Sequence, residues 1–268
     1  MPTRDWRRFA LPIRRSLGDA VDFLYPPACA LCGRSRHAAD SVPRLLCDEC
    51  QSDVAPLYPH RCHRCSAPVG PYVNTSAGCY HCSRDSFAFK RIVSLGIHHG
   101  PLRNAVLTVK QQKGAILANA LAELLITREQ AFFDVTGADV VVPVPHHWTD
   151  RLLSQHLPPE TLAACIAGLL KVPMGRHILK KVRRTPAQVE LEASERRRNL
   201  RDAFRLIGRP QLDGVRILLV DDVLTTGTTA HRAASLLKKA GATVNVAVLA
   251  RGLGAATQPF SDVPTGPF

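Results

Sequence analysis

The sequence is poor in aromatic residues and has no long apolar run. Phe, Trp and Tyr make up 6% of its 268 residues, so Leu, Val and Ala must supply most of the core. No segment reaches the ~20 consecutive apolar residues of a membrane-spanning helix. The first residues also lack the continuous apolar stretch of a secretory signal. We therefore expect a globular protein of the cytoplasm without a transmembrane segment.

Acidic residues are scarce as well. The chain has 22 Asp and Glu against 35 Lys and Arg, and its formal net charge is +13. A positive surface attracts phosphates, nucleic acid or an anionic membrane, although an Arg-rich composition produces the same charge without any such partner. Two basic clusters, at 180–184 and 196–198, are candidates for contact with DNA. Glu192 and Glu195 before the second cluster fit a solvated helix with internal ion pairs equally well.

The first 24 residues predict a short amphipathic helix. Trp6, Phe9, Ile13 and Leu17 recur every three or four residues, which is the spacing of one helix face. Such a helix can dock on the body of the protein or touch a membrane, and we favour docking.

Cysteine, in contrast, is abundant. Eight of the nine cysteines form four Cys-x-x-Cys pairs, and a tetrahedral zinc needs two such pairs. The pattern predicts a double zinc ribbon over residues 25–85 that holds up to two structural Zn²⁺ ions, with the candidate ligands Cys29, Cys32, Cys47, Cys50, Cys62, Cys65, Cys79 and Cys82. Sequential pairing and cross-braced pairing use the same ligands and both stay open. Disulfides are the competing use, but they require export.

Arg61 and Arg64 flank the third cysteine pair. They could grip phosphates or serve only to stabilise the ribbon, and we favour the structural role.

Strands alternate with helices over residues 88–251. Short apolar runs, typical of buried parallel strands, occur at 91–97, 140–144, 215–220 and 244–249. Helical periodicity appears at 101–109, 116–125, 159–170 and 229–239. This alternation predicts an α/β fold with a mostly parallel sheet flanked by helices. Residues 252–268, rich in Gly, Pro and Thr, are predicted to form a disordered tail.

The segment 217–229, ILLVDDVLTTGTT, combines the features of a sugar-phosphate site. Ligands of open α/β sheets bind beyond the carboxyl ends of the strands, where Asp221 and Asp222 are expected. The next residues offer hydroxyls and backbone N–H groups at a helix N-terminus, which favours an anion. These residues are Thr225, Thr226, Gly227, Thr228 and Thr229. Acids before a Thr-rich turn can also merely cap a helix, but the length of the pattern favours a binding site.

This segment resembles the phosphoribosyl-pyrophosphate (PRPP) motif of type I phosphoribosyltransferases. The resemblance implies that Asp221 and Asp222 bind the ribose hydroxyls, that the Thr/Gly residues hold the 5′-phosphate, and that Mg²⁺ accompanies PRPP. The four cysteine pairs, the Val-Pro-Val-Pro at 142–145, the stretch Thr185…Gln188…Glu195…Phe204 and the PRPP motif together resemble the ComF family over about residues 20–251. The resemblance implies a type I phosphoribosyltransferase-like domain behind a double zinc ribbon. In transformable bacteria, members of this competence-associated family act on incoming single-stranded DNA.

The sequence departs from the family after Pro145. Members usually carry several arginines and then Phe-Asn-Gln; here only Arg151 keeps the pattern, and Leu-Pro-Pro stands at 157–159. Lys110 remains in a second segment that otherwise differs. Arg151 and Lys110 are therefore the candidates for the pyrophosphate side of the site. Fewer cations would weaken stabilisation of the leaving diphosphate, so we expect PRPP or ribose-phosphate binding with impaired transfer.

Three functions fit these features. The first, which we favour, is a protein that binds PRPP or a ribose 5-phosphate moiety and assists single-stranded DNA handling together with other DNA-uptake proteins. The second is a Mg²⁺-dependent transferase of nucleotide salvage, in which an acceptor displaces pyrophosphate from C1 of PRPP. The third is a non-catalytic scaffold that senses a ligand. The sequence names no acceptor, and His146 and His147 are only weak candidates for a general base.

Overall fold

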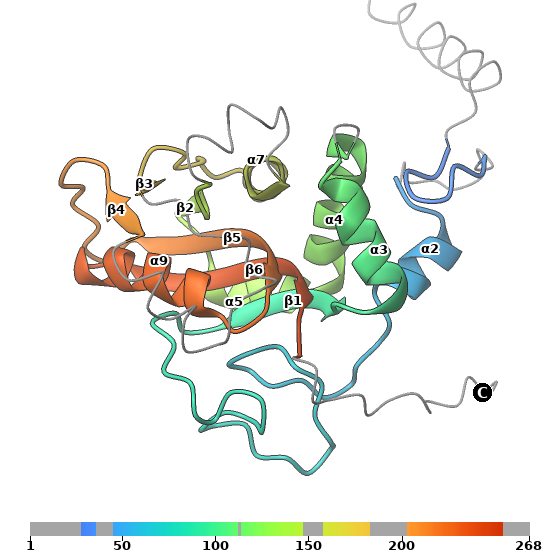
Figure 1. Cartoon of the computed structure of the whole chain (residues 1–268), viewed down its shortest axis with the longest axis horizontal. Helices are drawn as coiled ribbons and strands as arrows, with labels where there is room; N and C mark the ends of the chain where they lie inside the picture. Colours follow the sequence, from blue (N-terminus) through green and yellow to red (C-terminus); the bar gives the residue numbers. More distant parts are fainter. Residues whose placement is uncertain (1–27, 36–44, 112–113, 147–157, 183–202, 254–268) are drawn as a thin grey trace, which may run out of the picture.

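The computed structural model describes residues 28–35, 45–111, 114–146, 158–182 and 203–253. At its centre lies a four-stranded, fully parallel sheet in the order β1-β6-β5-β2 (Figure 1). The strands of this sheet are β1 (Ile92–Ile97), β2 (Val140–Pro143), β5 (Arg216–Leu224) and β6 (Thr243–Arg251). A small antiparallel pair, β3 (Leu179–Lys181) with β4 (Phe204–Leu206), lies beside it. The predicted parallel sheet is confirmed.

Helices pack on both faces of this sheet, as the alternating pattern requires. They are α2 (Asp48–Val54), α3 (Gly100–Val109), α4 (Ala115–Arg128), α5 (Gln130–Thr136), α7 (Pro158–Leu170) and α9 (Thr228–Lys239). Alternate residues of β5 serve the two faces. Leu218 and Val220 join the core under α3, α4 and α7, whereas Ile217 and Leu219 join the core under α9 and the β3–β4 pair. Each strand is therefore covered on both sides, which explains why the strands read as continuous apolar runs.

The two cysteine-rich segments contact different parts of the sheet. The first leads into α2, and Leu46 and Val54 pack in the core that contains α3 and α4. The second lies along the edge strand β1. There Arg61 donates hydrogen bonds to the carbonyls of Ser94 (2.7 Å) and Leu95 (3.4 Å) and pairs with Glu129 at 2.9 Å. Figure 1 shows the two segments well apart from each other.

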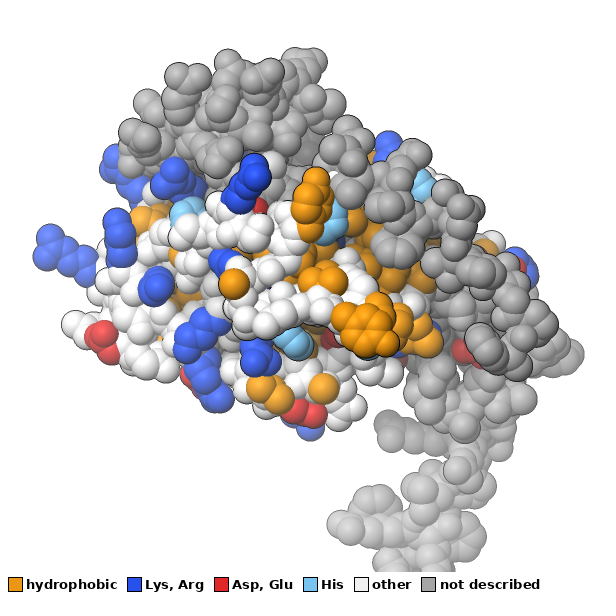
Figure 2. Space-filling view, turned by 90° about the horizontal axis from the view of Figure 1, so that it is seen from below, with side chains coloured by type: hydrophobic (Ala, Val, Ile, Leu, Met, Phe, Trp, Pro, Cys, Tyr) orange, Lys and Arg blue, Asp and Glu red, His pale blue; other side chains and the backbone are white. Residues whose placement is uncertain are grey.

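Lys and Arg side chains predominate over Asp and Glu on the face seen in Figure 2. That distribution agrees with the net charge of the sequence. Among the described residues, no helix is both long enough and apolar enough to cross a membrane.

Several expectations fall outside the described ranges. They are the amphipathic helix of the first 24 residues, Arg151, the basic cluster 196–198 and nearly all of the C-terminal tail. Within the described ranges, α2, α5 and the β3–β4 pair are additions that the sequence did not predict. β5 is also longer than expected, since it continues through both acids of the motif to Leu224. The reason is that β6 remains paired with it, with Asp221 opposite Val248 and Val223 opposite Ala250.

Candidate functional site

The eight paired cysteines form two tetrads, and the pairing is sequential. Cys29, Cys32, Cys47 and Cys50 make the first, and Cys62, Cys65, Cys79 and Cys82 make the second; within each tetrad all sulfur atoms lie within 4.8 Å of one another. Three Sγ–Sγ distances of 3.6 to 3.8 Å match the ~3.8 Å expected between thiolates bound tetrahedrally at ~2.3 Å from zinc. All nine cysteines are free, and these separations far exceed a disulfide bond of ~2.05 Å. The residues therefore fit two structural zinc ions.

The two tetrads differ in burial. All four cysteines of the second are buried, at 3% exposure or less. In the first, Cys32 is exposed and Cys47 is partly exposed. The second site is thus better shielded from chelators and oxidants than the first.

Arg61 and Arg64 serve the second ribbon structurally. The contacts of Arg61 with β1 and Glu129 use its guanidinium on protein groups. Arg64 donates to the carbonyls of Ala77 (2.7 Å) and Asp85 (2.9 Å), which ties the two ends of the ribbon together. Both arginines thus donate hydrogen bonds to other parts of the protein, which supports the structural role favoured from the sequence.

The residues of the 217–229 motif converge at the carboxyl edge of the sheet. β5 brings Asp221 and Asp222 to this edge, and the loop that follows leads directly into α9. Gly227 caps α9 with φ +73°, a left-handed conformation that favours glycine. The hydroxyls of Thr226 and Thr228 lie 2.8 Å apart across the turn. Together the loop and the first turn of α9 (residues 225–229), here named the phosphate loop, present hydroxyls and backbone N–H groups at one helix N-terminus.

The two acids differ electrostatically. Burial, and then the negative charge of Asp222, raise the pKa of Asp221 well above its ordinary value. Burial acts in the same direction on Asp222, but the Lys110 ammonium, whose Nζ lies 2.8 Å from Asp222 Oδ2, outweighs it and lowers the pKa of Asp222. The pair therefore retains a proton more readily than two isolated carboxyls would. Lys110, at the end of α3, sits directly on the acid pair that the resemblance assigns to the sugar hydroxyls.

Three residues beside this site were not singled out from the sequence. Arg251, at the end of β6, is 4% exposed and donates from Nη1 to the carbonyl of Leu224 at 3.0 Å and to that of Thr225. His98 follows β1 and has a buried Nε2 with no hydrogen-bond partner within the described residues. Burial and the nearby cationic Lys110 lower the pKa of His98. The third residue, Phe87, packs on the glycine of the phosphate loop. A charged residue that ends an apolar strand is a usable sequence feature, but nothing in the local sequence marks Phe87 or His98.

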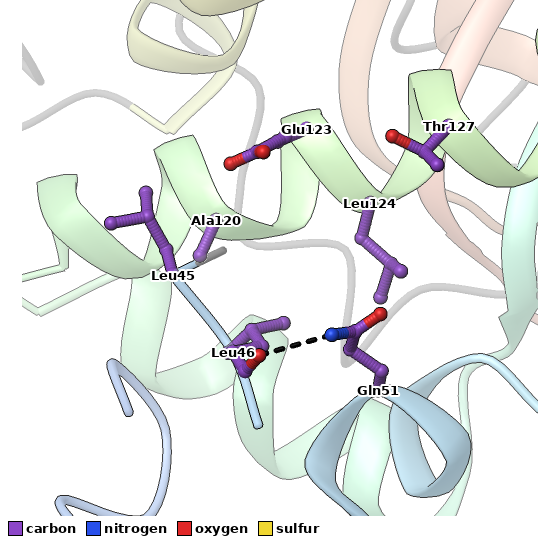
Figure 3. Close-up of a pocket in the computed structure, with 7 residues that line it drawn as sticks. All are labelled: Leu45, Leu46, Gln51, Ala120, Glu123, Leu124 and Thr127. Carbon is purple, nitrogen blue, oxygen red and sulfur yellow. Dashed lines mark hydrogen bonds between the residues drawn. The ribbon is translucent and has the colours of Figure 1, made fainter. Parts of the chain in front are cut away.

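A separate cavity of about 130 Å³ lies between the first ribbon and α4 (Figure 3). Its lining residues are Leu45, Leu46, Gln51, Ala120, Glu123, Leu124 and Thr127. The Gln51 side chain donates to the carbonyl of Leu46 at 3.0 Å and so uses its amide group within the fold. Its described lining includes a carboxylate and no cationic side chain, which does not favour a phosphate.

Comparison with known proteins gives the same two-part organisation. The family described as Double zinc ribbon domain matches residues 20–83, and the family described as Phosphoribosyl transferase domain matches residues 160–262. Adenine phosphoribosyltransferase from Saccharomyces cerevisiae, a solved structure, is 17% identical, with a TM-score of 0.33 over 50% of this chain and 69% of that one. The two family matches show that the protein is of the class in which a double zinc ribbon precedes a phosphoribosyltransferase-type domain.

Two relatives specify the family. DNA utilization protein YhgH of Salmonella typhi is 34% identical over 200 residues, which cover 72% of this chain and 84% of the relative. Competence protein F of Haemophilus influenzae is 27% identical over 217 residues, or 80% of this chain and 91% of the relative. The chain belongs to the ComF family.

Proposed function

We propose that this protein binds PRPP, or the ribose 5-phosphate moiety of a nucleotide, at the carboxyl edge of β5. The observation that carries the proposal is the acid pair followed by a threonine-rich turn around a left-handed glycine at the start of α9. The helix dipole and the backbone N–H groups at the start of α9 favour a phosphate there, and in this proposal Asp221 and Asp222 accept hydrogen bonds from the sugar hydroxyls. A single short turn separates the acid pair from the residues proposed to hold the phosphate. This short separation suits a ribose and its own 5′-phosphate.

Mg²⁺ belongs to the same proposal. Carboxylates and ligand oxygens are the hard donors that Mg²⁺ prefers, and the lowered pKa of Asp222 keeps this carboxyl ionised. When bound, the ion would neutralise part of the charge of the diphosphate. The role of the chain is to hold the sugar and the 5′-phosphate, and Lys110 is free to turn from Asp222 towards an arriving anion because its side chain is 46% exposed.

We further propose that the protein acts in the handling of single-stranded DNA during DNA uptake, in the cytoplasm. The names of the relatives, one a DNA utilization protein and the other a competence protein, support this role. The net charge of +13 and the basic face in Figure 2 suit a polyanionic partner. If phosphates are the contact, the affinity for single-stranded DNA falls steeply as salt is raised, with a log–log slope of roughly −0.7 for each phosphate neutralised.

Calorimetric titration with PRPP and Mg²⁺ tests the ligand. We expect the wild-type protein to bind and the Asp221→Asn/Asp222→Asn variant to lose binding. Asp139→Asn is the matched control, because Asp139 pairs with Arg216 at the opposite, amino edge of the sheet. Absence of heat with the wild-type protein, or equal binding by the double variant, would contradict the proposal. Pyrophosphate release measured on the same samples with added bases would reveal whether transfer occurs.

A further inference from the structure

The segment that leaves the second ribbon lies across the phosphate loop. A Cβ atom built on Gly227 would lie only 2.7 Å from Cε1 of Phe87, so the Phe87 ring rests directly on the glycine. The ring also stacks on Phe89, with centroids 4.6 Å apart and planes inclined by 15°. Phe89 is buried in the core beneath α9. The position of the Phe87 ring over the turn is thus fixed by its neighbours.

The same Phe87 ring packs against the buried core of the second ribbon. This core consists of Cys62, Cys65, Ala67, Cys79 and Cys82. The Arg64 guanidinium, whose Nη2 donates to the carbonyl of Asp85, lies 5.9 Å from the centre of the Phe87 ring. One side chain therefore bridges the buried core of the second ribbon and the glycine of the phosphate loop.

Two further contacts join the ribbon to the same turn. The backbone N–H of Ala88 donates to Nδ1 of His231 at 3.1 Å, and His231 lies in the first turn of α9. Leu253 packs against the cysteine cluster, and it follows the strand-ending Arg251 whose guanidinium binds the carbonyls of Leu224 and Thr225. The phosphate loop is therefore held from Phe87 on one side and from Arg251 on the other, and both lead to the second ribbon.

A loop that binds a phosphate through backbone N–H groups works only if those groups keep their directions. The left-handed glycine at its centre is the position with the greatest intrinsic freedom. A ribbon whose core is four thiolates folds around its metal, so its contacts persist only while zinc is bound. We infer that Phe87 and Arg251 are positioning residues of the phosphate loop, and that the zinc-loaded second ribbon is thereby a structural part of the sugar-phosphate site.

This inference rests on the proposed function for the identity of the ligand, but its structural half does not need a ligand. It also distinguishes the two ribbons. The first ribbon packs through Leu46 and Val54 in the core with α3 and α4. Only the second site should therefore be coupled to the phosphate loop, and by reciprocity a ligand at the loop should protect the second ribbon.

Hydrogen exchange of the full-length, zinc-loaded protein tests the structural half. In Phe87→Ala, and more mildly in Phe87→Leu, we expect faster exchange in peptides that cover residues 225–231. Phe132→Ala is the matched control: it removes the same ring from α5, which precedes β2 and so lies at the amino edge of the sheet, away from the phosphate loop. Exchange at 225–231 that is unchanged in both Phe87 variants, or raised equally in Phe132→Ala, overturns the inference whatever the ligand does.

Titration with ribose 5-phosphate tests the functional half. Each hydrogen bond from an N–H group to a charged phosphate is worth roughly tenfold in affinity, so we expect Phe87→Ala to bind at least about tenfold more weakly than wild type while Phe132→Ala binds normally. In wild type the ligand should slow exchange at residues 62–82 and leave residues 29–35 and 45–50 unchanged. Equal affinity of Phe87→Ala and wild type overturns the inference while the proposed function stands. If wild type does not bind but exchange at 225–231 rises in Phe87→Ala, the proposed ligand is wrong and the positioning role is supported.

Discussion

Replacing Gly227 by alanine measures how tightly the phosphate loop is held, and the chain supplies its own control. Gly227 and Gly208 have nearly the same positive φ, +73° and +70°. A methyl group at Gly208 would meet nothing within 4 Å, whereas at Gly227 it would lie 2.7 Å from Phe87 Cε1 and 3.3 Å from Cζ. Both substitutions therefore carry the cost of an alanine at positive φ, and only Gly227→Ala adds a steric contact with the Phe87 ring.

The magnitudes follow from these two terms. A left-handed alanine costs about 1–2 kcal/mol, which is the whole effect expected for Gly208→Ala. At Gly227 the ring must withdraw by roughly 1 Å to reach an ordinary carbon–carbon contact, and overpacking of this kind costs about 1–3 kcal/mol more. We expect Gly227→Ala to lower the free energy of unfolding by about 2–5 kcal/mol. The difference between the variants is the energetic signature of the Phe87 contact.

Urea denaturation followed by circular dichroism, with zinc in all buffers, gives both values. A double-mutant cycle then identifies the ring: in a Phe87→Leu background, Gly227→Ala should cost little more than Gly208→Ala, which gives a coupling of at least about 1 kcal/mol. Equal losses for Gly227→Ala and Gly208→Ala in the wild-type background would show that Phe87 does not press on the loop, and the reasoning would be refuted.

Other predictions follow from the ion pairs, the histidine of α9 and the two metal sites. Arg61→Met should lower the free energy of unfolding in urea titrations by about 1–3 kcal/mol, because it leaves the half-buried Glu129 carboxylate unpaired. Arg61→Met/Glu129→Leu should lower it by less than the single change. A double variant that is less stable than the single variant would contradict this. Burial lowers the pKa of His231, and its neutral Nδ1 accepts a hydrogen bond from the N–H of Ala88. The contribution of His231 to the stability of the fold is therefore present above its unfolded pKa of about 6.5, and it is lost as pH falls through its pKa in the folded state. Stability between pH 7 and 5 should therefore fall more in wild type than in His231→Gln, and parallel curves would disprove the assignment. Because Cys32 is exposed while the second tetrad is buried, a chelator should remove zinc in two phases, the first accompanied by faster exchange at residues 29–35 and 45–50 alone; simultaneous loss from both ribbons would count against it.

The parts of this protein that could be predicted from sequence are those encoded locally. The apolar runs located the four parallel strands because each strand is buried on both faces. The acids and the threonine-rich turn lie within one short segment, so their proximity needed no knowledge of the fold. The strands β3 and β4 escaped prediction because each has three residues, with charged side chains among them.

The remaining parts depend on the strand order, which the sequence does not state. Cysteine spacing predicted the ligands but left the pairing open, since cross-braced pairing uses the same ligands and its loops, about twice as long, cost only about 0.6 kcal/mol more to close. Phe87 and His98 reach the site because the segments around β1 lie near the carboxyl edge of β5 in the folded sheet. Lys110 was a candidate from the sequence, but its contact with Asp222 depends on the position of α3. Arg251 lies beside the site because it is the last residue of β6, the neighbour of β5. The residues that a motif search overlooks are thus the ones that tertiary structure brings in from separate elements.

The sheet order also bears on how the chain is made. β1 ends at Ile97, yet its neighbour in the sheet, β6, begins only at Thr243. During synthesis the N-terminal half emerges first, so the edge strand β1 waits for the last strand before it gains its partner in the sheet. Long-range pairing of this kind slows folding and leaves an apolar strand exposed in the nascent chain. A deletion that removes residues 243–253 should therefore destabilise an edge strand that lies about 150 residues earlier in the chain.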